Sequence, residues 1–221
     1  MEHAEDPKPA FHHVSTWVFD LDNTLYDPSI RLFDQIEGKM VDYVMRTLKV
    51  ERDTANHLRR EFYMTYGTTL AGLMEKHGVD ADPFLEEVHD IDFSALQPDP
   101  LLSARIAALP GRRIVYTNAT VPYARAVLEA RGMTPLFDAV YGVQEAAYHP
   151  KPRREAFERI FSLDAVITHQ AAMFEDDPRN LQVPHEMGMQ TILVGPEPMK
   201  APHIGHHSPD LSSFLGRLTG L

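Results

Sequence analysis

From residue 112 onward, short apolar segments alternate with amphipathic helical segments in this chain of 221 residues. The strand-like segments are RRIVYTN, DAVYG, AAMFEDD and QTILVG, and an earlier one spans residues 14–20. Helical patterns lie between and after them, at 121–131, 152–161, 178–188 and 208–218. Strands that alternate with helices predict a parallel sheet covered on both faces. The expected fold class is therefore α/β.

One block interrupts this alternation directly after the first strand. Ile30, Phe33, Ile36 and Met40 recur at intervals of three and four, which indicates one buried helix face. Further helical patterns lie near 52–64, 68–77 and 82–89, and no convincing strand occurs among them. The block is best interpreted as an inserted cap. The expected organisation is a flexible leader at 1–13, a core at 14–27 and 96–221, and an all-helical cap at 28–95.

Composition excludes several classes of function. The formal net charge of −11 repels nucleic-acid backbones, so no nucleic-acid partner is expected. The absence of cysteine removes disulfides, thiolate nucleophiles and cysteine-based zinc sites. No apolar run reaches transmembrane length, and the polar N-terminus is unlike a signal peptide, which predicts a cytoplasmic protein without membrane contact. A small anionic substrate remains compatible with this charge. The oligomeric state is not determined by the sequence.

Polar side chains follow four of the predicted strands. Asp20 and Asp22 follow the first, Thr117 and Asn118 the second, Lys151 the third, and Glu175-Asp176-Asp177 the fourth. The carboxyl ends of parallel strands share one edge of the sheet, where ligands of α/β proteins bind. Three of the carboxylates, Asp20, Asp22 and Asp176, offer the hard oxygen ligands that Mg²⁺ prefers. A hydroxyl and an ammonium suit a phosphate group.

Each of these pieces alone has an ordinary structural explanation. A D-x-D after an apolar run is often a turn, Thr117-Asn118 could cap a helix, and the acidic triplet could lie at a helix N-terminus. Their joint occurrence, in order and at strand ends, favours a phosphoryl-transfer site. No G-x-x-x-x-G-K-[ST] loop is present, which excludes a P-loop enzyme.

The four segments DLDNTL, VYTNA, HPKP and FEDDPRNL resemble the four motifs of the haloacid-dehalogenase-like (HAD) hydrolase superfamily. The resemblance covers residues 14–195 and, as a set, is highly specific. It implies a Rossmann-like core with strand order 5-4-1-2-3 and a mobile cap after the first motif. The helical block at 28–95 lies where this superfamily carries its helical cap.

Carried over by position, the resemblance implies that Asp20 is the nucleophile and forms an aspartyl-phosphate. It implies that Asp22 is the general acid and base, and that Thr117, Asn118 and Lys151 hold the phosphate. Mg²⁺ would be bound by Asp20, Asp176 and the backbone carbonyl of Asp22. Thr24 would help shape the first loop, and Glu175 would contact the ion through water. Asp177 is a further candidate for supporting the site from behind, although the resemblance assigns it no fixed role.

Several further segments, among them YGTTLAGLM and HDIDF, resemble the pyrimidine 5′-nucleotidase branch, which hydrolyses UMP and CMP. This implies a nucleotide as the phosphate monoester. The candidates for substrate contact in the cap are Gly67, Thr68, Thr69 and His89, with Asp90 and Asp92 nearby. A helix N-cap and a surface turn are equally good explanations of these two segments.

Two rival hypotheses remain. The same site could act on phosphoglycolate, a sugar phosphate or another small phosphate monoester, or the chain could be a catalytically idle HAD-fold binding protein. A haloalkanoate dehalogenase is disfavoured because that chemistry has no need of Asp22 or a metal cluster. His203, His206 and His207 are assigned to a surface loop, and Ser208 to the N-cap of the last helix.

Overall fold

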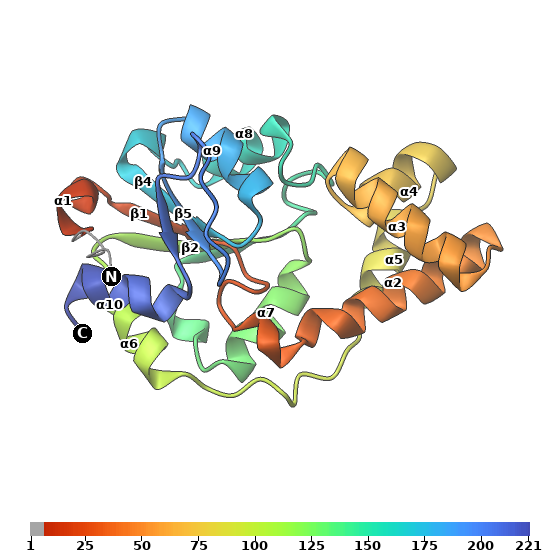
Figure 1. Cartoon of the computed structure of the whole chain (residues 1–221), viewed down its shortest axis with the longest axis horizontal. Helices are drawn as coiled ribbons and strands as arrows, with labels where there is room; N and C mark the ends of the chain where they lie inside the picture. The colour runs from red at the N-terminus through yellow and green to blue at the C-terminus, as the bar shows by residue number, and fades with distance from the viewer. Residues whose placement is uncertain (1–6) are drawn as a thin grey trace.

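The computed structural model describes residues 7–221, in which helices cover a central sheet and four further helices extend from one end (Figure 1). The strands are β1 (Thr16–Phe19), β2 (Arg112–Tyr116), β3 (Ala139–Tyr141), β4 (Ala171–Glu175), β5 (Gln190–Val194) and β6 (His206–Ser208). They pair in parallel in the order β3-β2-β1-β4-β5-β6. The α/β class is confirmed, and so is the order 5-4-1-2-3 over the first five strands. The sixth strand is an addition at the edge.

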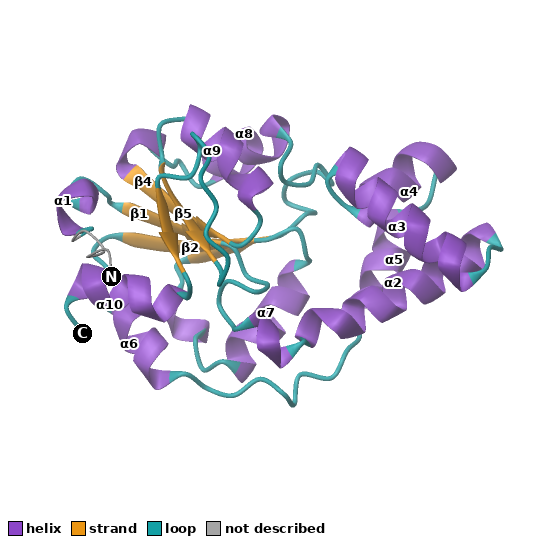
Figure 2. Ribbon diagram, viewed as in Figure 1, coloured by secondary structure: helices purple, strands orange, loops and turns teal. Residues whose placement is uncertain are grey.

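Helices cover both faces of the sheet, which explains the uninterrupted apolar runs WVF in β1, IVY in β2, AAMF in β4 and ILV in β5 (Figure 2). On one face lie α8 (Arg154–Leu163) and α9 (Gln182–Glu186). On the other lie α6 (Pro100–Ala107), α7 (Val121–Ala130) and α10 (Leu211–Thr219). In β1 the side chains alternate between these layers: Val18 belongs to the cluster with Phe157 of α8, and Phe19 to the cluster with Phe214 of α10.

The inserted block forms the helices α2 (Leu32–Leu48), α3 (Arg52–Tyr66), α4 (Thr69–His77) and α5 (Ala81–His89). The side chain of Thr68 caps α4 by accepting from the Ala71 backbone N–H at 3.1 Å, and Gly78 ends it in the left-handed conformation. The predicted helical character of this block matches the structure, whereas the cap boundaries at 28 and 95 stay a prediction. No helix within residues 7–221 has the length and apolar character to cross a membrane.

One buried arginine joins the two chain crossings between core and cap. Arg131 donates from Nε to the carbonyl of Leu25, where the chain leaves the core, at 3.2 Å. It also donates to the carbonyl of Gln97 and the carboxylate of Asp99, where the chain returns. Because the guanidinium is a planar donor with fixed geometry, these bonds fix the base of the cap relative to the sheet.

Two short elements differ from the sequence-based expectation. Residues 1–6 of the predicted leader lie outside the described residues, but Lys8–Phe11 form helix α1, and Phe11 is buried against Trp17 and Phe214. At the other end, His206 and His207 belong to β6 and not to a loop. Ser208 ends this strand, and the N-cap of α10 is Asp210, which accepts from the Ser213 backbone N–H at 2.7 Å.

Candidate active site

A buried lysine links the ends of three neighbouring strands. Lys151 Nζ lies 2.7 Å from Asp20 Oδ1 after β1 and 2.7 Å from Glu175 Oε2 at the end of β4. It also donates to the carbonyl of Tyr116 at the end of β2, at 3.1 Å. Burial alone would lower the pKa of Lys151, but the two carboxylates outweigh it and hold this pKa above its usual range. The ammonium therefore stays charged beside Asp20.

Asn118 positions this lysine. Its side-chain Nδ2 donates to the carbonyl of Lys151 at 3.1 Å, and its Oδ1 accepts from the Lys151 backbone N–H at 2.8 Å. The sequence predicts Asn118 as a phosphate ligand, but both polar atoms of its side chain bond to the Lys151 backbone. Any phosphate contact from Asn118 is thereby left to its backbone. Thr117 is buried, and its hydroxyl oxygen accepts from the Ala119 backbone N–H at 3.0 Å, which orients the hydroxyl.

Three carboxylates gather at one point beside the lysine. Oxygens of Asp20, Glu175 and Asp176 lie within 4.8 Å of one another. Burial and the neighbouring negative charges raise the pKa of both Glu175 and Asp176. Asn180 lies beside them in the lining of the same cavity, and its buried Oδ1 has no hydrogen-bond partner in the described part of the chain. A hydrated dication would offset the repulsion and offer water protons to Asn180, so these residues fit Mg²⁺.

From residue types alone, the carboxylates of Asp20, Asp22 and Asp176 were candidate ligands, whereas the family resemblance gave the metal only the backbone carbonyl of Asp22. The structure brings Glu175, and not the side chain of Asp22, to the cluster. Asp22 Oδ1 instead accepts hydrogen bonds from the hydroxyls of Tyr26 and Tyr123, both at 2.7 Å. Burial and the charge of Asp20 raise the pKa of Asp22 to about 6, which suits a group that gives and takes a proton near neutral pH.

The other residues expected to support the site have separate contacts. Thr24 Oγ1 donates to Asp20 Oδ2 at 3.2 Å, so each oxygen of Asp20 has a donor and keeps lone pairs for other bonds. Asp177 turns toward the cap, where it accepts from Tyr63 at 2.6 Å and pairs with Arg179. The Arg179 guanidinium in turn lies 4.0 Å from the centre of the Tyr63 ring. Asp177 therefore ties the cap to the core.

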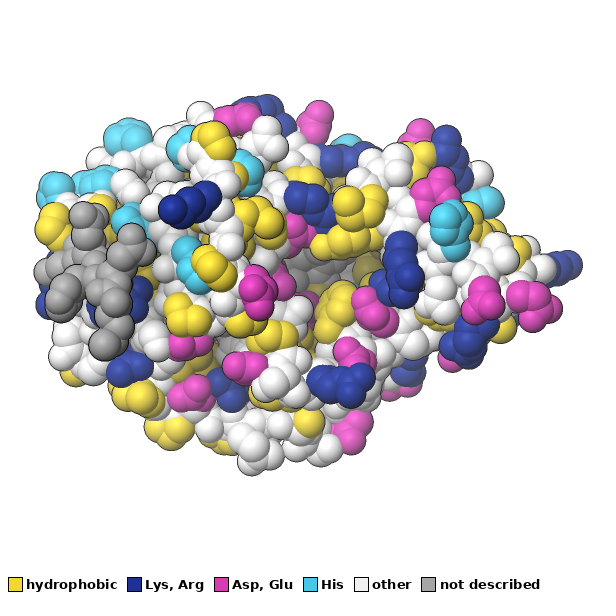
Figure 3. Space-filling model, in the orientation of Figure 1, with side chains coloured by type: hydrophobic (Ala, Val, Ile, Leu, Met, Phe, Trp, Pro, Cys, Tyr) yellow, Lys and Arg dark blue, Asp and Glu magenta, His cyan; other side chains and the backbone are white. Residues whose placement is uncertain are grey.

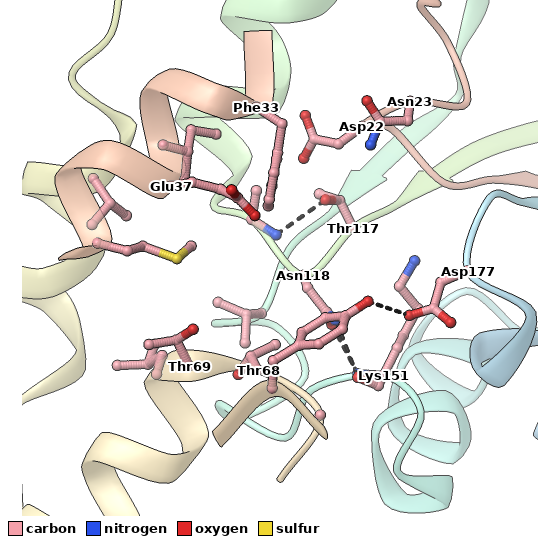
Figure 4. A pocket seen from close by; sticks show the side chains of 18 of the residues that line it. Asp22, Asn23, Phe33, Glu37, Thr68, Thr69, Thr117, Asn118, Lys151 and Asp177 are labelled. Carbon is pink, nitrogen blue, oxygen red and sulfur yellow. Dashed lines mark hydrogen bonds between the residues drawn. The ribbon is translucent and has the colours of Figure 1, made fainter. Parts of the chain in front are cut away.

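These groups open into a cavity of about 500 Å³ between core and cap, visible as a hollow in Figure 3. Figure 4 shows Lys151, Thr117 and Asp22 on its core side, and Glu37, Thr68 and Thr69 on its cap side. All four cap residues predicted to contact substrate, Gly67, Thr68, Thr69 and His89, line it. Asp90 and Asp92 are not among its lining residues.

The four cap residues lie there for different structural reasons. Gly67 has φ +93°, and a Cβ atom added to it would lie 3.0 Å from the Lys151 carbonyl oxygen, so the cap backbone meets the core there. The Thr69 hydroxyl donates to the carbonyl of Arg59 at 3.3 Å. His89 stacks on Tyr123 with ring centres 4.6 Å apart, and burial lowers its pKa to about 4, which keeps the ring neutral at pH 7.

Residues 14–188 match the model of the haloacid dehalogenase-like hydrolases. This chain belongs to that family of hydrolases. The match contains the ends of β1, β2 and β4 and Lys151, which are the parts that build the site. The geometry of this hydrolase thus agrees with the family expected from its four motifs.

Individual relatives support the fold more firmly than a reaction. Phosphate metabolism protein 8 of Saccharomyces cerevisiae is 23% identical over 205 residues, which are 85% of this chain and 63% of that protein. The hydrolase therefore spans less than two thirds of that relative. A HAD phosphatase from Thermococcus onnurineus superimposes with a TM-score of 0.61, 17% identity and coverage of 94% and 98%. L-2-haloacid dehalogenase from Xanthobacter autotrophicus superimposes with a TM-score of 0.60 and 16% identity, and the match covers 94% of this chain and 99% of that one. One fold thus carries both reactions.

Several residues near the site could not be predicted from the sequence pattern. Tyr123 reaches Asp22 from 101 positions away along the chain, on a helix whose pattern indicates only burial. Arg59 and Glu37, which line the cap side, read as ordinary charged positions of amphipathic helices. Asn23, next to Asp22, donates to Asp176 at 3.3 Å, and its position in the first motif was the one available clue.

Proposed function

We propose that this hydrolase is a Mg²⁺-dependent phosphomonoesterase that acts through Asp20. The observation that carries the proposal is the buried Lys151 ammonium, 2.7 Å from both Asp20 and Glu175, beside the third carboxylate of Asp176. An ammonium, a fixed carboxylate and an oxygen cluster for a dication are the groups that phosphoryl transfer requires.

The charges at the site support a dication as cofactor. When Asp20, Glu175 and Asp176 are ionised, they carry more negative charge than Lys151 neutralises, so a phosphate dianion would be repelled from the bare cluster. Mg²⁺ held by Asp20 and Asp176, with the backbone carbonyl of Asp22, would reverse the local sign and draw the phosphate in. In this proposal Glu175 holds Lys151 and contacts the hydrated ion from behind.

The chain's own residues account for the two steps of the reaction. An oxygen of Asp20 attacks phosphorus and forms the aspartyl-phosphate, while the bond from phosphorus to the ester oxygen breaks. Asp22, in its protonated form, gives its proton to the departing alkoxide. Ionised Asp22 then takes a proton from water, and the hydroxide displaces phosphate from Asp20. Thr117 and Lys151 donate to the phosphate oxygens in both steps.

The cavity favours a nucleoside monophosphate, most simply UMP or CMP, over smaller phosphate monoesters. Phosphoglycolate would leave most of the 500 Å³ empty. Beside polar groups such as Glu37 and Thr68, the cap side carries many apolar side chains, and the hydroxyls of a sugar phosphate would lose hydrogen bonds against them. These side chains are Phe33, Ile36, Met40, Leu70, Phe84, Leu85 and Val88. A flat base has apolar faces and a polar edge, and it suits such walls.

A panel of phosphate monoesters, assayed with and without Mg²⁺, tests this function. We expect UMP and CMP to be hydrolysed faster than phosphoglycolate or ribose 5-phosphate, with no turnover in excess EDTA. Asp20→Asn keeps the size of the side chain and removes the nucleophile, so it should abolish turnover. If none of the esters is hydrolysed, the result contradicts the proposal and favours a binding protein. Full activity of Asp20→Asn, or metal-free release of chloride from 2-chloropropionate, would contradict the mechanism.

A further inference from the structure

An ion pair within the cap faces the cavity opposite the lysine. Glu37 on α2 and Arg59 on α3 both line the cavity, and Arg59 Nη1 donates to Glu37 Oε1 at 2.9 Å. The side chain of Arg59 is 12% exposed and that of Glu37 is 42% exposed. Figure 4 shows Glu37 beside Phe33, with its carboxylate directed toward the core side of the cavity.

The guanidinium of Arg59 is incompletely satisfied. Within residues 7–221, Glu37 is the hydrogen-bond partner of this group, and its buried Nε has none. A nearly buried guanidinium with one acceptor is costly, because its Nε–H has lost water without a replacement. A ligand in the cavity that offers acceptors would reduce this cost. The second carboxylate oxygen of Glu37, whose side chain is 42% exposed, offers an acceptor beside those donors.

The surroundings limit what this ligand can be. Apolar side chains, including Phe33, Ile36 and Met40 on the same helix as Glu37, line the adjacent walls. The ion pair therefore borders an apolar surface of the cavity. A planar heterocycle fits this arrangement, because its faces can contact the apolar walls while its edge meets one acceptor and one donor.

We propose that Glu37 and Arg59 bind the hydrogen-bonding edge of a pyrimidine base whose phosphate lies at Lys151. In uracil, N3–H donates to the Glu37 carboxylate and O2 accepts from the Arg59 guanidinium. In cytosine, the amino group at C4 donates to Glu37 and N3 accepts from Arg59. Acceptor and donor follow each other in the same order in both bases, so Glu37 and Arg59 serve both when the base shifts by one ring position. This inference rests on the proposed phosphatase function and deepens it, since it assigns the residues that select the base.

Steady-state kinetics of the Mg²⁺-loaded enzyme with UMP and ribose 5-phosphate test the assignment. Ribose 5-phosphate keeps the phosphate ester and lacks the base. We expect Arg59→Met and Glu37→Met to lower the ratio of kcat/KM for UMP to that for ribose 5-phosphate by about tenfold to a hundredfold, mainly through KM for UMP. The control variants Arg46→Met and Glu87→Met break an exposed ion pair of the same cap outside the cavity lining, and should keep the wild-type ratio.

A second measurement needs no substitution in the protein. The 3-methyl derivative of UMP has lost the N3–H donor, so the wild-type enzyme should hydrolyse it at least about tenfold less efficiently than UMP. Equal efficiency on both nucleotides, or variants that slow UMP and ribose 5-phosphate to the same extent, would overturn the assignment to Glu37 and Arg59. Either outcome would leave the phosphatase function intact. That function itself would be refuted if the wild type hydrolysed no phosphate ester.

Discussion

Replacing Lys151 with methionine removes the positive charge from the carboxylate cluster and keeps the length of the side chain. The Lys151 side chain is 1% exposed, and its ammonium pairs with Asp20 and Glu175, each at 2.7 Å. Loss of one partner from a buried ion pair costs about 3–5 kcal/mol, because the remaining charge is left without compensation. Two carboxylates lose their partner here, which places the expected loss in the upper half of that range. For a chain of this size it lowers Tm by roughly 10–20 °C.

Thermal and urea unfolding in EDTA at pH 7.5 measure this loss. Lys39→Met is the matched control, because Lys39 pairs with an exposed Asp90 and its removal should cost no more than about 1 kcal/mol. Millimolar Mg²⁺ should stabilise Lys151→Met more than the wild type, since the dication replaces the lost charge and no longer meets the repulsion of the ammonium. A Lys151→Met protein that melts within about 3 °C of the wild type in EDTA would refute the reasoning.

Three further outcomes follow from single contacts. Gly72→Ala places a methyl group 2.3 Å from a phenylalanine ring and should cost about 1–3 kcal/mol in urea unfolding, whereas Gly38→Ala meets nothing within 4 Å and should stabilise α2 by about 0.5–1 kcal/mol. A double-mutant cycle of Tyr63→Phe and Asp177→Asn should show a coupling of about 0.5–1.5 kcal/mol in the free energy of unfolding. Additive effects of the two substitutions would contradict the hydrogen bond between cap and core. The unfolded chain protonates His89 near pH 6.5, and the folded chain protonates it only near pH 4. The folded state therefore loses stability as the pH is lowered from 6.5 to 4. Relative to His89→Gln, the wild type should lose about 2 kcal/mol between pH 7 and 4.5, and parallel pH profiles would contradict the burial of a neutral ring.

The central arrangement could be predicted because parallel βαβ units leave few choices. Once residues 14–20, 112–118 and 171–177 are assigned to strands, the polar residues that follow them must share one edge of the sheet. Asp20, Thr117 and Glu175 do so in the structure, and Lys151 reaches them from the loop after β3. Chain order and hydrophobic pattern were enough for this result.

The direction of Asp22 could not be predicted in the same way. Two positions after Asp20 in an extended strand, its side chain would point to the same side, because strand side chains repeat with a period of two. The strand ends at Phe19, however, and residues 22–24 lie in a turn, which includes Asn23 in the left-handed conformation. Asp22 therefore points toward Tyr26 and Tyr123 rather than toward Asp176.

The edge strand β6 has no usable signal in the sequence. His206–Ser208 are three polar residues without apolar alternation, and they follow a segment rich in Pro and Gly. They form a strand because the edge of β5 offers unpaired backbone groups, and because the ring of His206 packs against Phe11 and Phe214. Such contacts join three distant parts of the chain, so no local pattern reveals them.

The contacts between cap and core link the position of the cap side of the cavity to the position of the carboxylate cluster and Lys151 on its core side. Gly67 lies against the carbonyl of Lys151, and Tyr63 bonds to Asp177, the residue after a proposed metal ligand. Arg59 belongs to the same helix as Tyr63, and its carbonyl accepts from Thr69 of α4. A movement of α3 that shifted Arg59 would therefore also disturb the neighbours of Lys151 and Asp176. If the proposed base binds to the cap, its binding energy can in this way fix the geometry at phosphorus, which is the condition for using remote contacts to raise kcat.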